Sequence, residues 1–283
     1  MEQQKFRTSF GLIRRLLIVF TTGFPDQNFL GAFYIPFLLQ SISPKFRKNL
    51  ALNLLFISPH YYGTLPPNIR RQDFIEAEHQ GMLLSRESMI ERKVKPHLNQ
   101  NMIVLDHGCG PGYLASAVSR YCNRVIAVDI SSGVIACAKA INGKPNIEYI
   151  TESGTHLSQV ENSSIDLIYS FAVMQHVTDD VCQQILQEFF RVLKPQGKII
   201  CEFVVDLQNT GNASINKQIL NPFVKKIKER YILRVLGRPF PKIEKFILDS
   251  GLEIAKVTAN KFDPGEEKSK DAELYYTFVL TKP

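Results

Sequence analysis

The chain has 283 residues, of which 45% are hydrophobic and 22% charged, and its formal net charge is +7. These values are ordinary for a soluble globular protein, and the length suits one large α/β domain with additions or two small domains. The charge is compatible with an acidic substrate or an anionic surface. No block of Lys and Arg interleaved with aromatic residues occurs, so nucleic acid is not expected as a partner.

The five cysteines, at positions 109, 122, 137, 182 and 201, form no C-x-x-C pair. Most of them fall inside predicted core elements, so we expect free thiols in a reducing compartment and no metal site. This pattern favours a cytoplasmic location.

The N-terminal region carries two apolar runs, Phe10–Phe20 and Phe29–Leu39. Neither reaches about 18 uninterrupted apolar residues, so no transmembrane helix is predicted. A secretory signal is disfavoured because the small-residue cleavage site is missing. We interpret residues 1–84 as a helical extension or cap over the core domain. The alternative is a peripheral membrane contact through the N-terminal segment, because basic residues flank apolar ones.

Further along, the spacing of apolar residues predicts a helix over Phe74–Lys95. Residues 102–130 then read as a strand, a glycine-rich turn, a helix and a second strand. Gly108, Gly110 and Gly112 lack a Cβ, so the turn can press against a ligand, and the helix N-terminus that follows favours an anionic group. Asp129 closes the second strand, where an acid can accept hydrogen bonds from both hydroxyls of a ribose. The unit therefore predicts a nucleoside-type ligand.

The kind of nucleoside depends on one position. A dinucleotide fingerprint requires glycine where this chain has Tyr113, which disfavours a nicotinamide-dependent oxidoreductase. The run Leu105-Asp106-His107-Gly108-Cys109-Gly110-Pro111-Gly112 instead resembles motif I of the class I S-adenosylmethionine-dependent methyltransferases. The resemblance extends over residues 85–283, which it identifies as the domain that binds S-adenosylmethionine (SAM).

The resemblance implies roles for particular residues. Asp106 would hold the glycine loop and approach the methionyl amino group, Asp129 would bind the ribose, and Ile130 would pack on the adenine. The complete set of cofactor contacts that it implies is Asp106, Gly108, Cys109, Gly110, Gly112, Asp129, Ile130, Ser153, Gly154, Ser170 and Phe171. Segments before motif I often form a lid in this family, which makes His60, Tyr61, Tyr62 and His79 candidate pocket residues, although a packed or solvent-facing role is the alternative for each.

Two positions depart from the family pattern. Ser153 stands where an acid usually accepts a hydrogen bond from the adenine amino group, with Glu152 close enough to substitute. Gln196 replaces the first glycine of the family's L-K-P-G-G turn, which here spans residues 194–198.

The remaining elements follow in order. We expect helices at Ser132–Ala140, Val181–Leu193 and Lys242–Ser250, and strands at Ile147–Ile150, Ile165–Phe171, Ile199–Val205, Leu252–Ala259 and Tyr275–Thr281. Together with the unit at 102–130 and the resemblance, they predict an α/β fold: a Rossmann-like, doubly wound sheet of about seven strands with its last strand antiparallel. The N-terminal helical extension and a lid insertion after the fifth strand complete the prediction.

The insertion, residues 206–245, contains a basic stretch over Phe223–Arg238 with six Lys and Arg residues against Glu229 alone. We weigh two interpretations of it: a solvated helix face, or a basic lid that recognises a carboxylate, phosphate or anionic lipid head group. The aromatic N-terminal third points weakly to a hydrophobic acceptor.

His176, which follows the fourth predicted strand, is the candidate general base, because its ordinary pKa of about 6.5 suits proton acceptance near neutral pH. The alternative is that His176 orders its loop or lines the cofactor. The sequence thus predicts SAM-dependent methylation of a small molecule, at an O, N or C atom that the sequence does not specify. A non-catalytic SAM-fold scaffold or regulatory subunit is the competing hypothesis, and the oligomeric state is not predicted.

Overall fold

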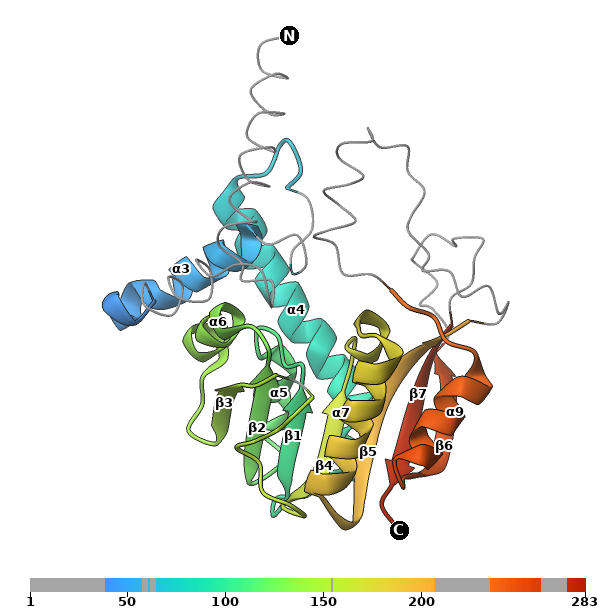
Figure 1. The fold of residues 1–283 in the computed structure, drawn as a ribbon. Coiled ribbons are helices and arrows are strands. Elements are labelled where there is room, and N and C mark those ends of the chain that lie inside the picture. The colour runs from blue at the N-terminus through green and yellow to red at the C-terminus, as the bar shows by residue number, and fades with distance from the viewer. Residues whose placement is uncertain (1–38, 58–60, 62–64, 154, 207–234, 261–273) are drawn as a thin grey trace. The chain divides into compact units, whose positions relative to one another are not determined.

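A computed structural model of the chain describes residues 39–57, 61, 65–153, 155–206, 235–260 and 274–283. Within these ranges, seven strands form a mixed sheet in the order β3-β2-β1-β4-β5-β7-β6 (Figure 1). The strands are β1 (Ile103–His107), β2 (Arg124–Asp129), β3 (Ile147–Thr151), β4 (Ile165–Ser170), β5 (Leu193–Val205), β6 (Glu253–Asn260) and β7 (Leu274–Thr281).

The directions of the strands agree with the predicted fold class. The pairs β1–β4, β2–β3 and β4–β5 are parallel, whereas β7 runs antiparallel to both β5 and β6. The prediction of a seven-stranded α/β sheet with an antiparallel last strand is confirmed. In a sheet of this kind, ligand-binding groups are expected at the carboxyl ends of the parallel strands.

The described helices are α3 (Pro44–Ile57), α4 (Arg71–Lys93), α5 (Tyr113–Val118), α6 (Ser132–Asn142), α7 (Asp179–Val192) and α9 (Phe240–Asp249), with short 3-10 turns η1 (Lys95–His97) and η2 (Met174–His176). Helices α4, α5, α6, α7 and α9 match the sequence predictions to within a few residues, and α3 falls in the predicted N-terminal helical extension, for which the sequence predicts no individual bounds. Local signals explain several ends. The Ser131 hydroxyl caps α6 by accepting a hydrogen bond from the Val134 N–H, and α7 begins with two acids, which its dipole favours.

The described chain divides into two compact units. The first contains residues 39–95, 109–120 and 125–151, and therefore α3, α4, the glycine-rich turn from residue 109, β2, α6 and β3. The second contains residues 96–108, 121–124 and 152–283, and therefore β1, β4 to β7, α7 and α9.

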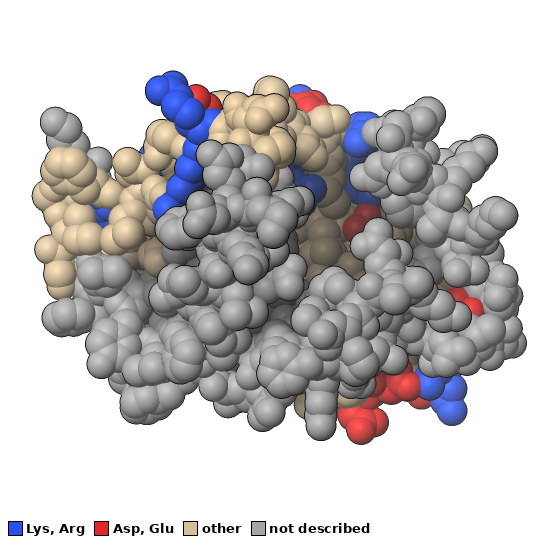
Figure 2. All heavy atoms as spheres, turned by 90° about the horizontal axis from the view of Figure 1, so that it is seen from above, with Lys and Arg blue, Asp and Glu red and all other residues tan. Residues whose placement is uncertain are grey.

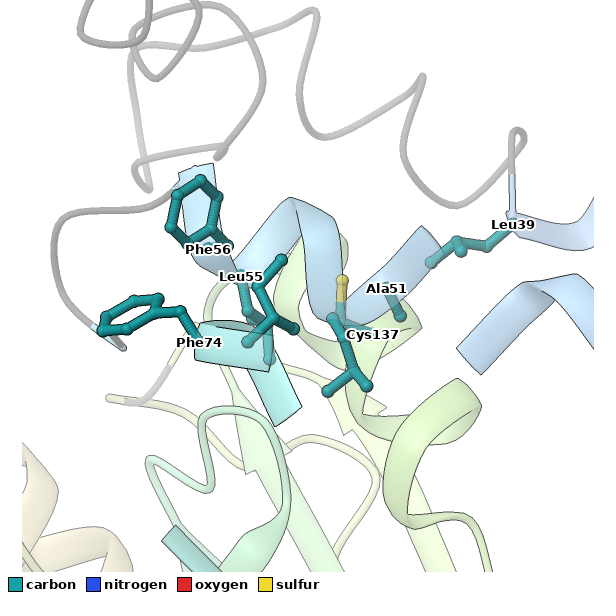
Figure 3. Close-up of a cluster of buried hydrophobic side chains, with 8 residues drawn as sticks. Leu39, Ala51, Leu55, Phe56, Phe74 and Cys137 are labelled. Atoms are coloured by element: carbon teal, nitrogen blue, oxygen red, sulfur yellow. The ribbon is translucent and has the colours of Figure 1, made fainter. Parts of the chain in front are cut away.

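In the first unit, the N-terminal helices share a hydrophobic core with the predicted cofactor-binding segment. Helix α3 packs on α6, and α4 packs on α5. Figure 3 shows the α3 side chains Leu55 and Phe56 beside Phe74 of α4 and Cys137 of α6. The predicted boundary after residue 84 falls inside α4, which runs without interruption to Lys93. Helices α3 and α4 are therefore packed into the unit that contains the glycine turn, because their apolar residues complete its core.

In the second unit, β5 differs from the prediction. The predicted turn at 194–198 is part of β5, in which the pairing with β4 jumps from Ile165–Leu193 to Leu167–Lys198. Gln196 has a φ of +64° at this irregularity. The Pro-Gln-Gly run therefore forms an irregularity inside β5, beyond which the pairing with β4 resumes.

Other predictions lie on residues that the structure does not describe. They concern the apolar run Phe10–Phe20, most of Phe29–Leu39 and the basic stretch up to residue 234. Within the described ranges, no helix has the combined length and apolar character that crossing a bilayer requires.

Candidate functional site

The glycine-rich turn holds three glycines in the left-handed region of backbone space. The φ angles are +73° at Gly108, +51° at Gly110 and +78° at Gly112. A Cβ is disfavoured in this region, which explains the G-x-G-x-G pattern without reference to any ligand.

The three glycines differ in how closely other atoms of the protein approach the position that a Cβ would occupy. A Cβ on Gly108 would collide with Val173, and a Cβ on Gly112 would collide with the Tyr149 hydroxyl. At Gly110, the nearest described atom to such a Cβ would be a ring carbon of Tyr61 at 3.7 Å, an ordinary contact distance. Gly108 and Gly112 therefore allow close packing of the protein on itself, whereas among the described residues a Cβ on Gly110 would meet only Tyr61, at an ordinary contact distance.

Asp129 ties the glycine turn to the end of β2. Its carboxylate accepts hydrogen bonds from the Gly110 N–H at 3.0 Å and from the Ser131 N–H at 2.9 Å, one on each oxygen. Burial raises the pKa of Asp129, and the backbone N–H groups of Ser131, Gly110 and Ile130 oppose that rise. Because a carboxylate has about four acceptor sites, Asp129 keeps the capacity to accept a hydrogen bond from a hydroxyl besides these backbone N–H groups.

Tyr61 is the candidate pocket residue that the structure places at the turn. Besides approaching Gly110, it packs against the core cluster of α3 and α4. Burial raises the pKa of Tyr61 well above its usual value, and Asp129, Cys137 and Cys109 add to the rise. Its hydroxyl therefore keeps its proton. His60 and Tyr62 lie outside the described residues.

His79 is buried within the first unit and contacts Tyr113, which stands where a dinucleotide-binding motif requires glycine. Nδ1 of His79 and the hydroxyl of Tyr113 share a hydrogen bond of 2.8 Å. Tyr113 is the first residue of α5, so this bond joins α4 to the helix that follows the glycine turn. In the sequence, Tyr113 disfavours the binding of a dinucleotide, but sequence reasoning did not identify His79, 34 positions away, as its hydrogen-bond partner.

The other predicted contacts near the turn are placed as follows. Asp106 and Cys109 are buried, and the Cys109 N–H donates to the Val128 carbonyl at 2.9 Å. Ile130 is 44% exposed, so its side chain is available to a ligand.

The segment after β3 was expected at the adenine edge. Ser153 is exposed, and its hydroxyl donates to the His156 carbonyl at 3.4 Å. Glu152 uses one carboxylate oxygen to accept hydrogen bonds from Ser158 and Gln159. Gly154 is not among the described residues.

At the end of β4, the predicted contact residues have protein partners. Ser170 is fully buried, and its Oγ lies 3.1 Å from Nδ1 of His107, which links β4 to β1. Phe171 stacks on Tyr169 with ring centroids 5.8 Å apart. Ala172 follows with a φ of +58°, a left-handed conformation that is strained for a residue with a Cβ.

His176 ends the 3-10 turn η2, and its N–H donates to the Val173 carbonyl at 2.9 Å. Its side chain is half-buried. Next to it, Gln175 is buried, and its carboxamide oxygen has no hydrogen-bond partner among the described residues.

The structure changes the interpretation of Arg238, which the sequence placed in the basic lid. Its side chain is only 3% exposed, and its guanidinium bonds Asp179 and the carbonyls of Met174 and Val177. Arg238 is therefore not available to recognise an anionic substrate. On the face shown in Figure 2, the described Lys and Arg side chains form separate groups instead of one continuous basic patch.

Residues 105–201, which include the glycine turn, Asp129 and His176, match the model of a methyltransferase domain family. A protein of Mycolicibacterium smegmatis named "Probable S-adenosylmethionine-dependent methyltransferase" is 31% identical over 121 residues, covering 42% of this chain and 44% of the relative. A ubiquinone biosynthesis O-methyltransferase of Bartonella tribocorum is 27% identical over 191 residues, covering 64% of this chain and 74% of the relative.

Among solved structures, phosphoethanolamine N-methyltransferase 2 of Haemonchus contortus, in complex with phosphomonomethylethanolamine and S-adenosylhomocysteine, aligns with a TM-score of 0.51. The identity is 17%, and the alignment covers 71% of this chain and 53% of that protein. A similarity at this identity shows a shared fold. The chain thus spans less than half of the first relative and about half of this structural neighbour.

Proposed function

We propose that the chain is a class I SAM-dependent methyltransferase that transfers a methyl group from SAM to a small-molecule acceptor, because residues 105–201 match a methyltransferase domain family. The main support for the proposal is the hydrogen bond from the Gly110 N–H of the glycine turn to the Asp129 carboxylate, within residues 105–201. The named relatives support a small-molecule acceptor, since one is a ubiquinone biosynthesis O-methyltransferase and the structural neighbour holds phosphomonomethylethanolamine. We assign no acceptor atom.

The residues present fit SAM on two structural grounds. Among the described residues, Gly110 leaves its backbone approachable, as close contact with the methionyl part requires. Both oxygens of Asp129 accept hydrogen bonds from backbone N–H groups, and the carboxylate keeps the capacity to accept one from a ribose hydroxyl. We propose that these two residues hold the methionyl and ribose parts, that Ile130 packs on the adenine, and that Ser153 donates or accepts at its edge.

When bound, SAM supplies an electrophilic methyl group on a sulfonium. The chain's own residues then have to hold the acceptor in line with that group, exclude water and remove a proton from a neutral nucleophile. We propose that the His176 imidazole accepts that proton. Its position in the η2 turn, which follows the carboxyl end of the parallel strand β4, supports this role.

The test is calorimetric titration of the purified protein with SAM, S-adenosylhomocysteine and NAD, followed by transfer of labelled methyl groups to a panel of phenols, catechols and amines. Binding of the first two ligands with no response to NAD, and transfer to at least one acceptor class, is the expected result. A folded protein that binds neither SAM nor S-adenosylhomocysteine contradicts the proposal. Binding without transfer to any acceptor supports the competing hypothesis of a non-catalytic scaffold.

A further inference from the structure

The turn that carries His176 is bracketed by one buried arginine. The η2 turn comprises Met174, Gln175 and His176. Nη1 of Arg238 donates to the Met174 carbonyl at 2.7 Å, and Nη2 donates to the Val177 carbonyl at 2.5 Å. The two terminal nitrogens of a single guanidinium therefore bind the carbonyls on either side of Gln175 and His176.

The same arginine is fixed from two other directions. Its Nε donates to Asp179 at 2.7 Å, and the other carboxylate oxygen of Asp179 pairs with Lys242 at 2.5 Å. The Arg238 backbone forms two hydrogen bonds with the end of β5: its N–H donates to the Val204 carbonyl at 3.0 Å, and its carbonyl accepts from the Asp206 N–H at 2.9 Å. Arg238 is thus anchored to the sheet while its side chain reaches the turn.

A third contact joins the same two segments. The Leu236 N–H donates to the Gln175 carbonyl at 2.7 Å. The carbonyls of Met174, Gln175 and Val177 are therefore all bound by the short segment from Leu236 to Arg238. A turn of three residues has few hydrogen bonds of its own, and the φ of +58° at Ala172 adds strain at its entrance, so these outside contacts fix its geometry.

We propose that Arg238 is a positioning residue for the acceptor side of the site: its guanidinium fixes the η2 turn and, through the turn, the orientation of the His176 imidazole. This inference rests on the proposed function of His176 and goes beyond it by naming the residue that sets its geometry. A buried charge contributes little net stability, because the cost of removing it from water offsets its attraction to Asp179. A planar fork that binds two carbonyls at fixed angles, however, supplies geometry that lysine cannot reproduce.

Arg191 provides a matched control in the same unit. Its guanidinium also binds two backbone carbonyls, Leu157 at 2.9 Å and Val160 at 3.1 Å, and pairs with the carboxylate of Glu188 at 2.8 Å. The loop that it holds precedes β4 and leads into the amino end of that strand. Like Arg238, Arg191 therefore binds two backbone carbonyls and one carboxylate, but the carbonyls that it binds do not belong to the turn of His176.

The experiment compares Arg238→Lys with Arg191→Lys in the full chain. Histidine ring signals are recorded by ¹H–¹³C NMR, with the His176 signal assigned by its loss in His176→Gln. We expect Arg238→Lys to shift or broaden the His176 signal and to lower kcat for the best acceptor by about a hundredfold, while the Kd for SAM changes less than about twofold. Arg191→Lys should leave both the His176 signal and kcat near their wild-type values.

An unchanged His176 signal in folded Arg238→Lys overturns the proposal, as does an equal shift in Arg191→Lys. If Arg238→Lys does not fold, Asp179→Asn provides the second variant, because it removes the charged partner that orients Nε of Arg238 and leaves the arginine in place. Asp179→Asn should shift the His176 signal, and an unchanged signal counts against the proposal. The NMR measurement needs no acceptor, so it is distinct from failure of the proposed function, which SAM titration of the wild type reports.

Discussion

The carboxylate of Asp129 accepts a hydrogen bond from the backbone N–H of Gly110 at 3.0 Å, across 19 positions of sequence. The residue expected to bind the ribose therefore also fixes the glycine turn. Its second oxygen bonds the Ser131 N–H, and Ser131 caps α6. One carboxylate thus orders the turn, the end of β2 and the start of the next helix.

The first prediction concerns Asp129→Asn. The amide has one acceptor oxygen instead of two, so it must give up either a backbone N–H or a ribose hydroxyl. We expect SAM binding to weaken by about 1.5–3 kcal/mol, the usual value of a hydrogen bond to a charged group, and the free energy of unfolding to fall as well. Calorimetry and urea unfolding measure the two effects.

Asp166→Asn is the control for this prediction. Asp166 also accepts a backbone N–H, from Ile103 at 2.8 Å, and pairs with Lys194 at 2.7 Å, but it stands near the amino end of β4. The variant should lose stability while its Kd for SAM stays at the wild-type value. Equal weakening of SAM binding in Asp129→Asn and Asp166→Asn would show that Asp129 acts only through folding.

The second prediction separates two glycines of the same turn. Both have positive φ, so alanine costs about 1–2 kcal/mol of backbone strain at either position. At Gly112 the added methyl would also collide with the Tyr149 hydroxyl and ring, whereas at Gly110 it would meet, among the described residues, only an ordinary contact with Tyr61. We expect Gly112→Ala to lower the thermal midpoint far more than Gly110→Ala.

Binding should show the opposite order among the folded variants. Gly110→Ala places a methyl group on the approachable backbone and should weaken SAM binding by at least about tenfold, which corresponds to about 1.4 kcal/mol. If Gly110→Ala binds SAM as tightly as the wild type, the methionyl part does not approach this glycine, and the assignment of the turn is wrong.

Sequence reasoning succeeded where the signal is local. The positions of Gly108, Gly110 and Gly112 and their distance from Asp129 could be recognised because backbone conformation and chain length restrict them tightly. Apolar periodicity likewise predicted α4 and α7 to within a few residues. These features depend on residues that are near one another along the chain.

The failures concern contacts between distant residues. A basic stretch in the sequence does not reveal which arginine is buried, and Arg238 is fixed by carbonyls 64 and 61 positions earlier. Ser170 could not be paired with His107, 63 positions away, from either local pattern. At Gln196, strand pairing beyond the Pro-Gln-Gly run overrode its local preference for a turn. In each case, the partner that determines the structure lies far from the residue along the chain, so a local sequence pattern does not contain it.

The last prediction concerns the hydrogen bond between His79 and Tyr113, which joins α4 to the helix after the glycine turn. Burial lowers the pKa of His79, and nearby Lys48 lowers it further, although Glu76 opposes them. The folded protein therefore keeps His79 neutral at a pH where the unfolded chain, with an ordinary histidine pKa of about 6.5, has taken up a proton. The stability due to neutral His79 is complete above the unfolded-state pKa and is lost as the pH falls below it.

We expect the free energy of unfolding of the wild type, measured in urea between about pH 5 and pH 8, to decrease on the acid side more steeply than that of His79→Gln. His156→Gln, at a side chain that is 71% exposed, is the control for the loss of a histidine elsewhere in the chain. Tyr113→Phe should cost about 1–3 kcal/mol at the alkaline end of this range, since it leaves a buried ring nitrogen without this hydrogen bond. Parallel pH curves for the wild type and His79→Gln would mean that His79 titrates alike in the folded and unfolded states, contrary to its buried position in α4.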